Sequence, residues 1–163
     1  MVIILMGVTG SGKTTVGTLL AADLGWLFYD ADDFHPSNNI TKMQSGIPLS
    51  DADREPWLRD LEKLIRESAE KRLPIVLACS ALKAIYRARL KAAAGQEAWQ
   101  FIYLRISPSV ALERLKQRVR HFMSSALVPS QFETLEEPNE AVVVDGVLAP
   151  EEIVSEIRRE LGI

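Results

Sequence analysis

A glycine-rich segment near the start of the chain has the residues of a phosphate-binding loop. Residues 7–14 read Gly-Val-Thr-Gly-Ser-Gly-Lys-Thr and match the pattern G-x-x-x-x-G-K-[ST] in full. Glycines let the backbone wrap closely around an anion with its N–H groups pointing inward. In such a loop Lys13 acts in catalysis by reaching the β- and γ-phosphates, and the hydroxyl of Thr14 ligates Mg²⁺. We therefore expect Mg²⁺ and a nucleotide, which is contacted by Gly7, Val8, Thr9, Gly10, Ser11, Gly12, Lys13, Thr14 and Thr15.

Two aspartates are candidates for metal support and proton transfer. A phosphate-loop site needs a carboxylate near its Mg²⁺, and the predicted strand at 74–79 provides none. Asp30 and Asp32 follow another short predicted strand, and side chains two apart in an extended segment project to the same side. We expect Asp30 to support the metal and Asp32 to orient or deprotonate an acceptor hydroxyl. The alternative is a solvated acidic turn in which Asp30 caps a helix.

The elements that position these residues follow from the alternation of apolar runs and amphipathic stretches. This alternation predicts an α/β fold, a three-layer α/β/α sandwich with a five-stranded parallel sheet, in one domain spanning 1–163. We expect one helix to begin with Pro56 in its first turn. The predicted strands are 2–6, 26–29, 74–79, 99–104 and 141–144, and further helices follow the phosphate loop, run through 81–93, and begin at Pro108 and Pro150.

Two long polar stretches fall outside this scheme. Such insertions in a compact domain are usually functional loops or lids. We expect a substrate-binding insertion at about 31–54 and a mobile lid at about 118–140.

The bulk composition excludes several classes of function. A net charge of −3 over 163 residues argues against a general nucleic-acid binder. No apolar stretch approaches the length of a membrane span, and the apolar opening lacks the basic start of a secretory signal. Cys79 is the single cysteine, so no internal disulfide forms, and its apolar setting indicates a buried, unreactive thiol. A cytoplasmic protein without membrane or nucleic-acid partners is the simplest interpretation.

Several motifs, in this order and spacing, resemble the gluconokinase family of small P-loop kinases over nearly the whole chain. They are residues 30–36, 46–49, 51–58, 79–83 and 130–132, with His121-Phe122-Met123 and Leu135-Glu136-Glu137-Pro138. The resemblance implies a P-loop kinase fold with a mobile lid, ATP as the nucleotide, and a homodimer. It implies phosphorylation of D-gluconate at its 6-hydroxyl, giving 6-phospho-D-gluconate and ADP. Two positions depart from the family pattern, Ala31 in place of glycine and Arg120 before His121.

A polyol carboxylate needs a cation and several hydrogen-bonding groups around it. Arg54, Lys83 and Arg87 are candidate partners for the carboxylate, since arginine binds it as a bidentate fork. His35 is a candidate for bonding a hydroxyl or supporting Asp32. As the alternative, Lys83 and Arg87 stand four apart on a predicted helix, where surface charge is common.

The lid is expected to exclude water and to supply an arginine. Arg118 matches the lid arginine of the family and is our candidate for neutralising charge on the transferring phosphoryl group. Arg114 lies one turn earlier and fits an ordinary surface residue, and His121 fits either the lid or a hinge.

Two other functions fit parts of the sequence. One is a kinase for another small acceptor, such as shikimate or a nucleoside monophosphate. The other is a nucleotide-dependent regulatory module that hydrolyses ATP slowly. Acceptor-dependent ADP production separates all three.

Overall fold

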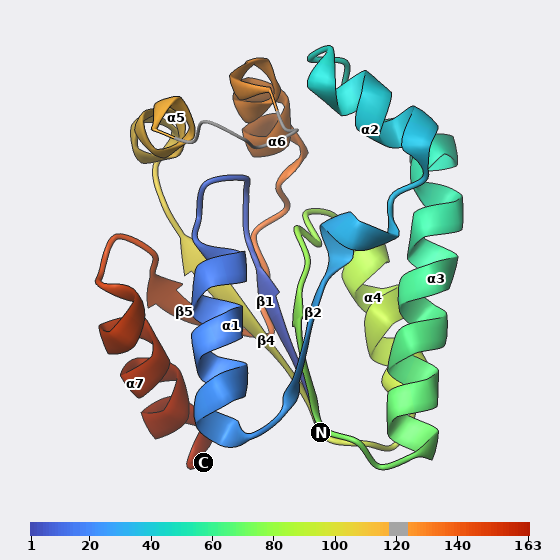
Figure 1. The fold of residues 1–163 in the computed structure, drawn as a ribbon, viewed down its shortest axis with the longest axis vertical. Coiled ribbons are helices and arrows are strands. Elements are labelled where there is room, and N and C mark those ends of the chain that lie inside the picture. Colours follow the sequence, from blue (N-terminus) through green and yellow to red (C-terminus); the bar gives the residue numbers. More distant parts are fainter. Residues whose placement is uncertain (118–123) are drawn as a thin grey trace.

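A parallel sheet forms the centre of the molecule. The computed structural model describes residues 1–117 and 124–163. In that part of the chain the sheet has five strands in the order β2-β3-β1-β4-β5, all neighbours pairing in parallel (Figure 1). The strands are β1 (Val2–Met6), β2 (Leu27–Asp30), β3 (Ile75–Ala78), β4 (Trp99–Arg105) and β5 (Ala141–Asp145). The predicted five-stranded parallel sheet is confirmed, with strand ends displaced by one residue at most.

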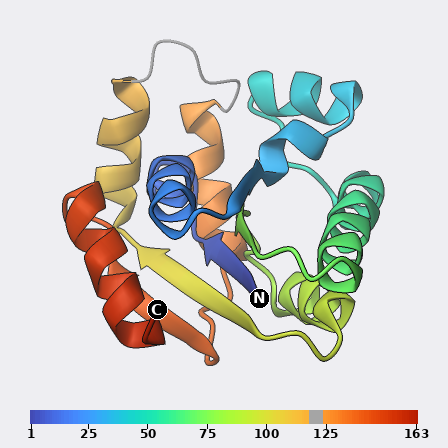
Figure 2. The same cartoon turned by 60° about the horizontal axis from the view of Figure 1, so that its bottom comes forward.

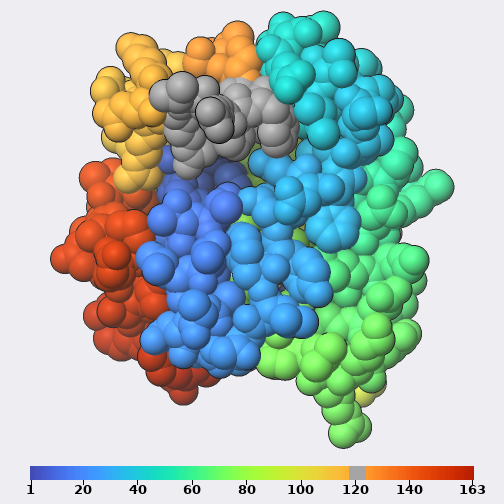
Figure 3. Space-filling view, in the orientation of Figure 1, coloured from blue at the N-terminus to red at the C-terminus, as the bar shows by residue number. Residues whose placement is uncertain are grey.

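Helices cover both faces of this sheet. The first face carries α1 (Lys13–Leu24) and α7 (Pro150–Leu161), which lie side by side in the space-filling view (Figure 3). The second face carries α3 (Asp51–Glu70) and α4 (Ala84–Ala94), on the opposite side of the sheet in both ribbon views (Figures 1 and 2). Because both faces are covered, β1 is buried along its whole length, with Ile3 packed on one side and Ile4 on the other. The three-layer sandwich is confirmed.

Short helices gather above the carboxyl ends of the strands, at the top of Figure 1. This is the edge at which open α/β sheets bind their ligands. A separate apolar cluster joins two of these helices to the phosphate loop, through contacts that include Val8, Ala111 and Val128. The helices are the 3₁₀ turn η1 (Ala31–Phe34), α2 (Ser37–Gln44), α5 (Pro108–Lys116), the 3₁₀ turn η2 (Ser125–Leu127) and α6 (Val128–Thr134).

The start of α3 differs from the sequence prediction. The helix begins at Asp51, so Pro56 lies in its second turn and residues 51–54 belong to a helix instead of the predicted insertion loop. The reason is a capping box: Ser50 Oγ accepts from the backbone N–H of Asp53 at 3.1 Å, and Asp53 Oδ2 accepts from the N–H of Ser50 at 2.9 Å. These bonds satisfy the N–H groups of Ser50 and Asp53 at the start of the helix, and Pro56 then removes a single later helical hydrogen bond.

Length and charge decide whether a helix can cross a membrane. The longest, α3, has 20 residues and carries charged side chains throughout. Among the helices that the structure describes, none is long and apolar enough to span a bilayer.

Candidate active site

The phosphate loop connects β1 to α1 in a conformation that needs glycine. Gly10 has a φ of +81° and Gly12, which caps α1, has a φ of +98°, both in the left-handed region that disfavours other residues. A Cβ on Gly10 would lie 3.1 Å from the carbonyl oxygen of Ala111 in α5. Lys13 Nζ donates to the carbonyl of Val8 at 3.0 Å, across the same loop. The positive end of α1 points into this cradle, which therefore suits the phosphates of a nucleotide.

Asp30 connects the loop to the second strand. Its Oδ2 accepts from Thr14 Oγ1 at 2.6 Å, and its Oδ1 accepts from the backbone N–H of Asp32 at 3.0 Å. Asp30 is thus both the cap of η1 and the carboxylate beside the loop threonine, so the two interpretations of the sequence are compatible. The expected extended geometry is wrong because the chain turns into η1 at Ala31. Asp30 and Asp32 nevertheless line one cavity together.

The conformation of Ala31 shows how alanine replaces the glycine of the family pattern. The residue begins η1 and is buried, and it is not among the described residues with a left-handed φ. Its carbonyl oxygen accepts from Trp57 Nε1 at 2.7 Å. Alanine therefore fits here without strain, as expected for a position that does not need positive φ.

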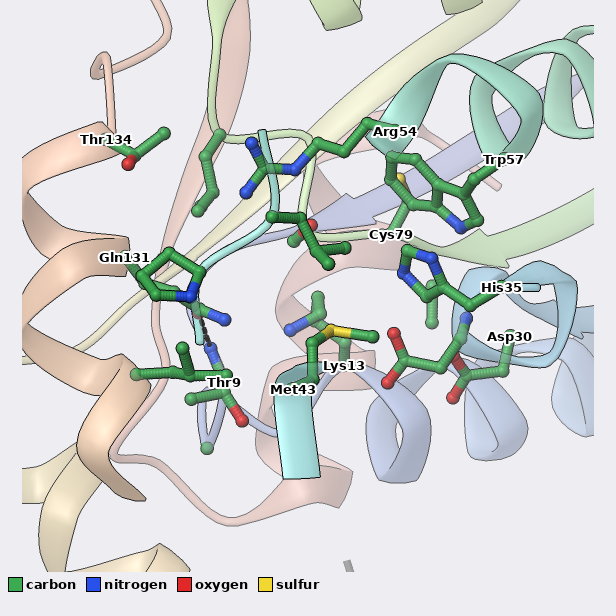
Figure 4. Close-up of a pocket in the computed structure, with 18 of the residues that line it drawn as sticks. Thr9, Lys13, Asp30, His35, Met43, Arg54, Trp57, Cys79, Gln131 and Thr134 are labelled. Carbon is green, nitrogen blue, oxygen red and sulfur yellow. Dashed lines mark hydrogen bonds between the residues drawn. The ribbon is translucent and has the colours of Figure 1, made fainter. Parts of the chain in front are cut away.

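His35, Trp57 and Arg54 form the wall facing the phosphate loop. In Figure 4 Lys13 lies between Gln131 on one side and His35 with Asp30 on the other. The rings of His35 and Trp57 are stacked, with centroids 4.7 Å apart and planes at 6°. Burial lowers the pKa of His35 to about 4, and the positive charge of Arg54 acts in the same direction. His35 is therefore neutral at pH 7 and able to bond a hydroxyl.

Trp57 is buried and also lines the cavity, so it belongs to the core and to the site wall at once. Cys79 lines the same cavity. Burial raises the pKa of its thiol to about 12, in agreement with the expected unreactive cysteine.

Lys83 and Arg87 are not brought into the cavity. Lys83 caps α4 and its Nζ pairs with Asp51 at 2.7 Å, while Arg87 donates through one nitrogen to the carbonyls of Ala81 and Leu82, at 3.0 Å each. Neither side chain is among those lining the cavity, although Leu82 is. The structure differs from the expectation that both side chains face the substrate. Asp51 holds Lys83, and two backbone carbonyls hold Arg87.

Gln131 is a site residue that reasoning from residue types did not single out. Its Oε1 accepts from the backbone N–H of Thr9 at 2.7 Å, a contact between positions 122 residues apart, drawn as a dashed line in Figure 4. The bond ties α6 directly to the phosphate loop. The one sequence signal was the Ser130-Gln131-Phe132 motif, which carried the family resemblance without a role.

Arg114 is another correction. Instead of an ordinary surface position, its guanidinium donates to the carbonyls of Gly10 at 3.1 Å and Gly146 at 2.7 Å. It therefore fastens the outer side of the phosphate loop to the turn after β5. The predicted lid residues Arg118, Arg120 and His121 lie outside the described residues.

Comparisons with known proteins agree with this geometry. The model of the shikimate kinase family matches residues 9–161. A gluconokinase from Gluconobacter oxydans is 41% identical over 161 residues, covering 96% of this chain and 89% of the relative. The chain belongs to the gluconokinase family, inside the broader shikimate kinase family.

Solved structures of similar proteins superpose on this chain over the whole fold. A gluconokinase from Sinorhizobium meliloti superposes with a TM-score of 0.87 at 42% identity, covering 98% of this chain and 90% of that one. A sugar kinase from a Janibacter species gives a TM-score of 0.90 at 39% identity, covering 99% and 94%. The resemblance inferred from the sequence motifs is confirmed, and with it the P-loop kinase fold.

Proposed function

We propose that this chain transfers the γ-phosphoryl group of ATP to the 6-hydroxyl of D-gluconate, giving 6-phospho-D-gluconate and ADP. One observation carries the proposal: the phosphate loop and the side chains of Asp32, His35 and Arg54 line a single cavity. Membership of the gluconokinase family supports nucleotide use and this acceptor. The cavity thus has a nucleotide side and a polyol side that meet at Lys13.

The residues divide the reaction between them. Lys13 and the amino end of α1 hold the phosphates and neutralise charge that develops on them. Asp32 accepts the proton of the 6-hydroxyl as the oxygen attacks phosphorus and the bond to the ADP oxygen breaks. Arg118 is proposed to approach the transferring group from the lid. These roles require only positioning and electrostatics, which is what phosphoryl transfer demands of a protein.

Mg²⁺ is proposed as the metal, held by Thr14 and Asp30. Their oxygens lie 2.6 Å apart beside the loop, and hard oxygen ligands suit this ion. No group of three or more His, Cys, Asp or Glu side chains able to hold a metal occurs in the described residues. This fits an ion that takes most of its ligands from phosphates and water. When bound, it would neutralise phosphate charge.

Acceptor recognition is proposed to rest on Arg54 and His35. Arg54 is placed to bind the gluconate carboxylate, and neutral His35 to bond a hydroxyl near Asp32. Lys83 and Arg87 are proposed to support the wall through the bonds described above. The segment 31–54, which ends in the first turn of α3, is proposed as the acceptor-binding insertion and about 118–140 as the lid, both within one domain.

The assembly is proposed to be a cytoplasmic homodimer. Light scattering of the purified protein tests the oligomeric state: a mass near twice the 18.1 kDa of the chain is expected. A mass equal to one chain would overturn the dimer and leave the proposed reaction untouched.

The reaction is tested by a coupled ADP-release assay with ATP and Mg²⁺. D-Gluconate is compared with shikimate, AMP, glycerate and no acceptor. Strong stimulation by gluconate alone is expected. Turnover of a different acceptor without turnover of gluconate would overturn the substrate assignment. Slow ADP release at the same rate with every acceptor would favour a regulatory module.

A further inference from the structure

Arg54 is connected to a chain of polar groups behind the cavity wall. Its Nη1 donates to the hydroxyl of Tyr86 at 3.2 Å, and that hydroxyl donates to Asp51 Oδ1. The same carboxylate oxygen accepts from Lys83 Nζ at 2.7 Å. Tyr86 is 5% exposed and does not line the cavity, whereas Arg54 does. This series of polar groups therefore reaches Arg54 from the side of the protein, and Arg54 is the guanidinium proposed to face the acceptor.

The direction of each bond is fixed by chemistry. A carboxylate only accepts and a guanidinium only donates, so the single phenolic proton must go to Asp51 and the oxygen lone pair must face Arg54. Burial and the bond to Asp51 raise the pKa of Tyr86, so this proton is retained at neutral pH. The ring is also flanked by two cations, with Arg54 Cζ and Lys83 Nζ each 5.6 Å from its centroid.

Charge is distributed so that Arg54 stays available to an anion. The ammonium of Lys83 lies against Asp51 and, through its hydrogen bond, holds the pKa of that carboxyl below its usual range. Among the described residues no carboxylate lies within ion-pair distance of Arg54, which touches Asp51 only through the neutral hydroxyl of Tyr86. The guanidinium is thus oriented by a neutral partner.

We propose that Tyr86 and Asp51 are positioning residues that hold the Arg54 guanidinium in its acceptor-binding orientation and so set the affinity for the acceptor's carboxylate. The inference rests on the proposed function, in which Arg54 binds gluconate. An arginine side chain loses much rotational freedom when it binds a ligand. A group already oriented before binding avoids that loss, so the pair improves affinity without touching the substrate.

The variant Tyr86→Phe tests this directly, because it keeps the buried ring and removes the hydroxyl. We expect the KM for gluconate to rise about five- to tenfold, as for loss of one net hydrogen bond, with the KM for ATP unchanged. Tyr103→Phe is the matched control: Tyr103 is equally buried and its hydroxyl lies 3.4 Å from Glu137, outside the cavity. The control should leave both KM values at the wild-type level.

A double-mutant cycle with Arg54→Ala separates positioning from general support of the fold. If Tyr86 acts through Arg54, Tyr86→Phe has no further effect on the gluconate KM once Arg54 is alanine. An additive effect would overturn the inference. If Tyr86→Phe does not fold, as judged by thermal unfolding, the exposed Asp51→Ala carries the same test and the same expected rise.

The outcomes also separate this inference from the proposed function. An unchanged gluconate KM in Arg54→Ala would remove Arg54 from acceptor binding, and the positioning role with it. A raised KM in Arg54→Ala together with a wild-type KM in Tyr86→Phe and Asp51→Ala would overturn the positioning role alone.

Discussion

Asp32 is the residue on which the proposed proton transfer depends. It reaches the cavity from η1, where its backbone N–H is held by Asp30, so its carboxylate is placed by the same residue that contacts Thr14. We predict that Asp32→Asn lowers kcat by about 10²–10⁴-fold, the usual contribution of a general base, while the KM for ATP stays near wild type. Asp33→Asn is the control, since Asp33 is the exposed neighbour and does not line the cavity. Near-normal turnover in Asp32→Asn would exclude it as the base.

His35 makes a prediction about pH and stability. Its pKa is about 4 in the folded protein against 6.5 for an ordinary histidine. Between these values the histidine binds a proton in the unfolded chain but not in the folded one. The free energy of unfolding is therefore unaffected by this group above pH 6.5. As the pH falls towards 4, protonation of the unfolded chain lowers it by at most about 3 kcal/mol. His35→Phe keeps a ring against Trp57 and cannot titrate.

Urea unfolding at pH 7 and pH 5 measures the effect. The wild type should lose more free energy of unfolding than His35→Phe between these values. Equal losses in the wild type and His35→Phe would contradict a depressed pKa at this site.

At the scale of elements, α6 is coupled to the phosphate loop by a hydrogen bond as well as by apolar packing. Gln131 Oε1 accepts from the N–H of Thr9 at 2.7 Å, and α6 packs through Val128 on the cluster that contains Val8. We predict that Gln131→Ala lowers kcat/KM for ATP about three- to tenfold, as expected for one hydrogen bond that orders the loop. Gln117→Ala is the control, because the Gln117 amide contacts Glu113 on the outside of α5. An unchanged kcat/KM in Gln131→Ala would show that the Gln131–Thr9 hydrogen bond does not order the loop for ATP.

The elements themselves were largely predictable, whereas their contacts were not. Continuous apolar runs such as 2–6 predict buried parallel strands, since a sheet covered on both faces needs no alternation. The start of α3 differs from the prediction because the capping box of Ser50 and Asp53 begins the helix before Pro56. The phosphate loop and Asp30 were identified from local spacing.

Long-range bonds account for what the sequence could not reveal about the site. Gln131 meets Thr9 across 122 positions and Arg114 meets Gly10 across 104, and no local pattern encodes either contact. The charge of Lys83 predicts a contact with the substrate, but folding places it against Asp51, 32 positions away. A charged side chain can be predicted from sequence to need a partner, but the choice between protein and ligand is decided by the fold.

At the scale of the whole molecule, the site exists only when distant parts of the chain are assembled. Its lining runs from Thr9 to Thr134 and draws on the phosphate loop, η1, α3 and α6. Ligands should therefore bind the folded chain and not the unfolded one, and each should raise the melting temperature by an amount that grows with the logarithm of its concentration above its Kd. The two ligand sides are carried by different elements, Lys13 at the start of α1 and Arg54 near the start of α3.

Reciprocal variants make this separation measurable by thermal unfolding. At about 100 times its Kd, a ligand adds about 2.7 kcal/mol, which corresponds to a shift of roughly 5–10 °C for a domain of this size. Lys13→Ala should lose the shift produced by ATP and keep the shift produced by gluconate, and Arg54→Ala should do the reverse. Each variant is the control for the other, since both remain able to report one ligand. Loss of both shifts in either variant would mean that the nucleotide and acceptor sides are one cooperative unit, because a side chain confined to one of them could not abolish binding at the other.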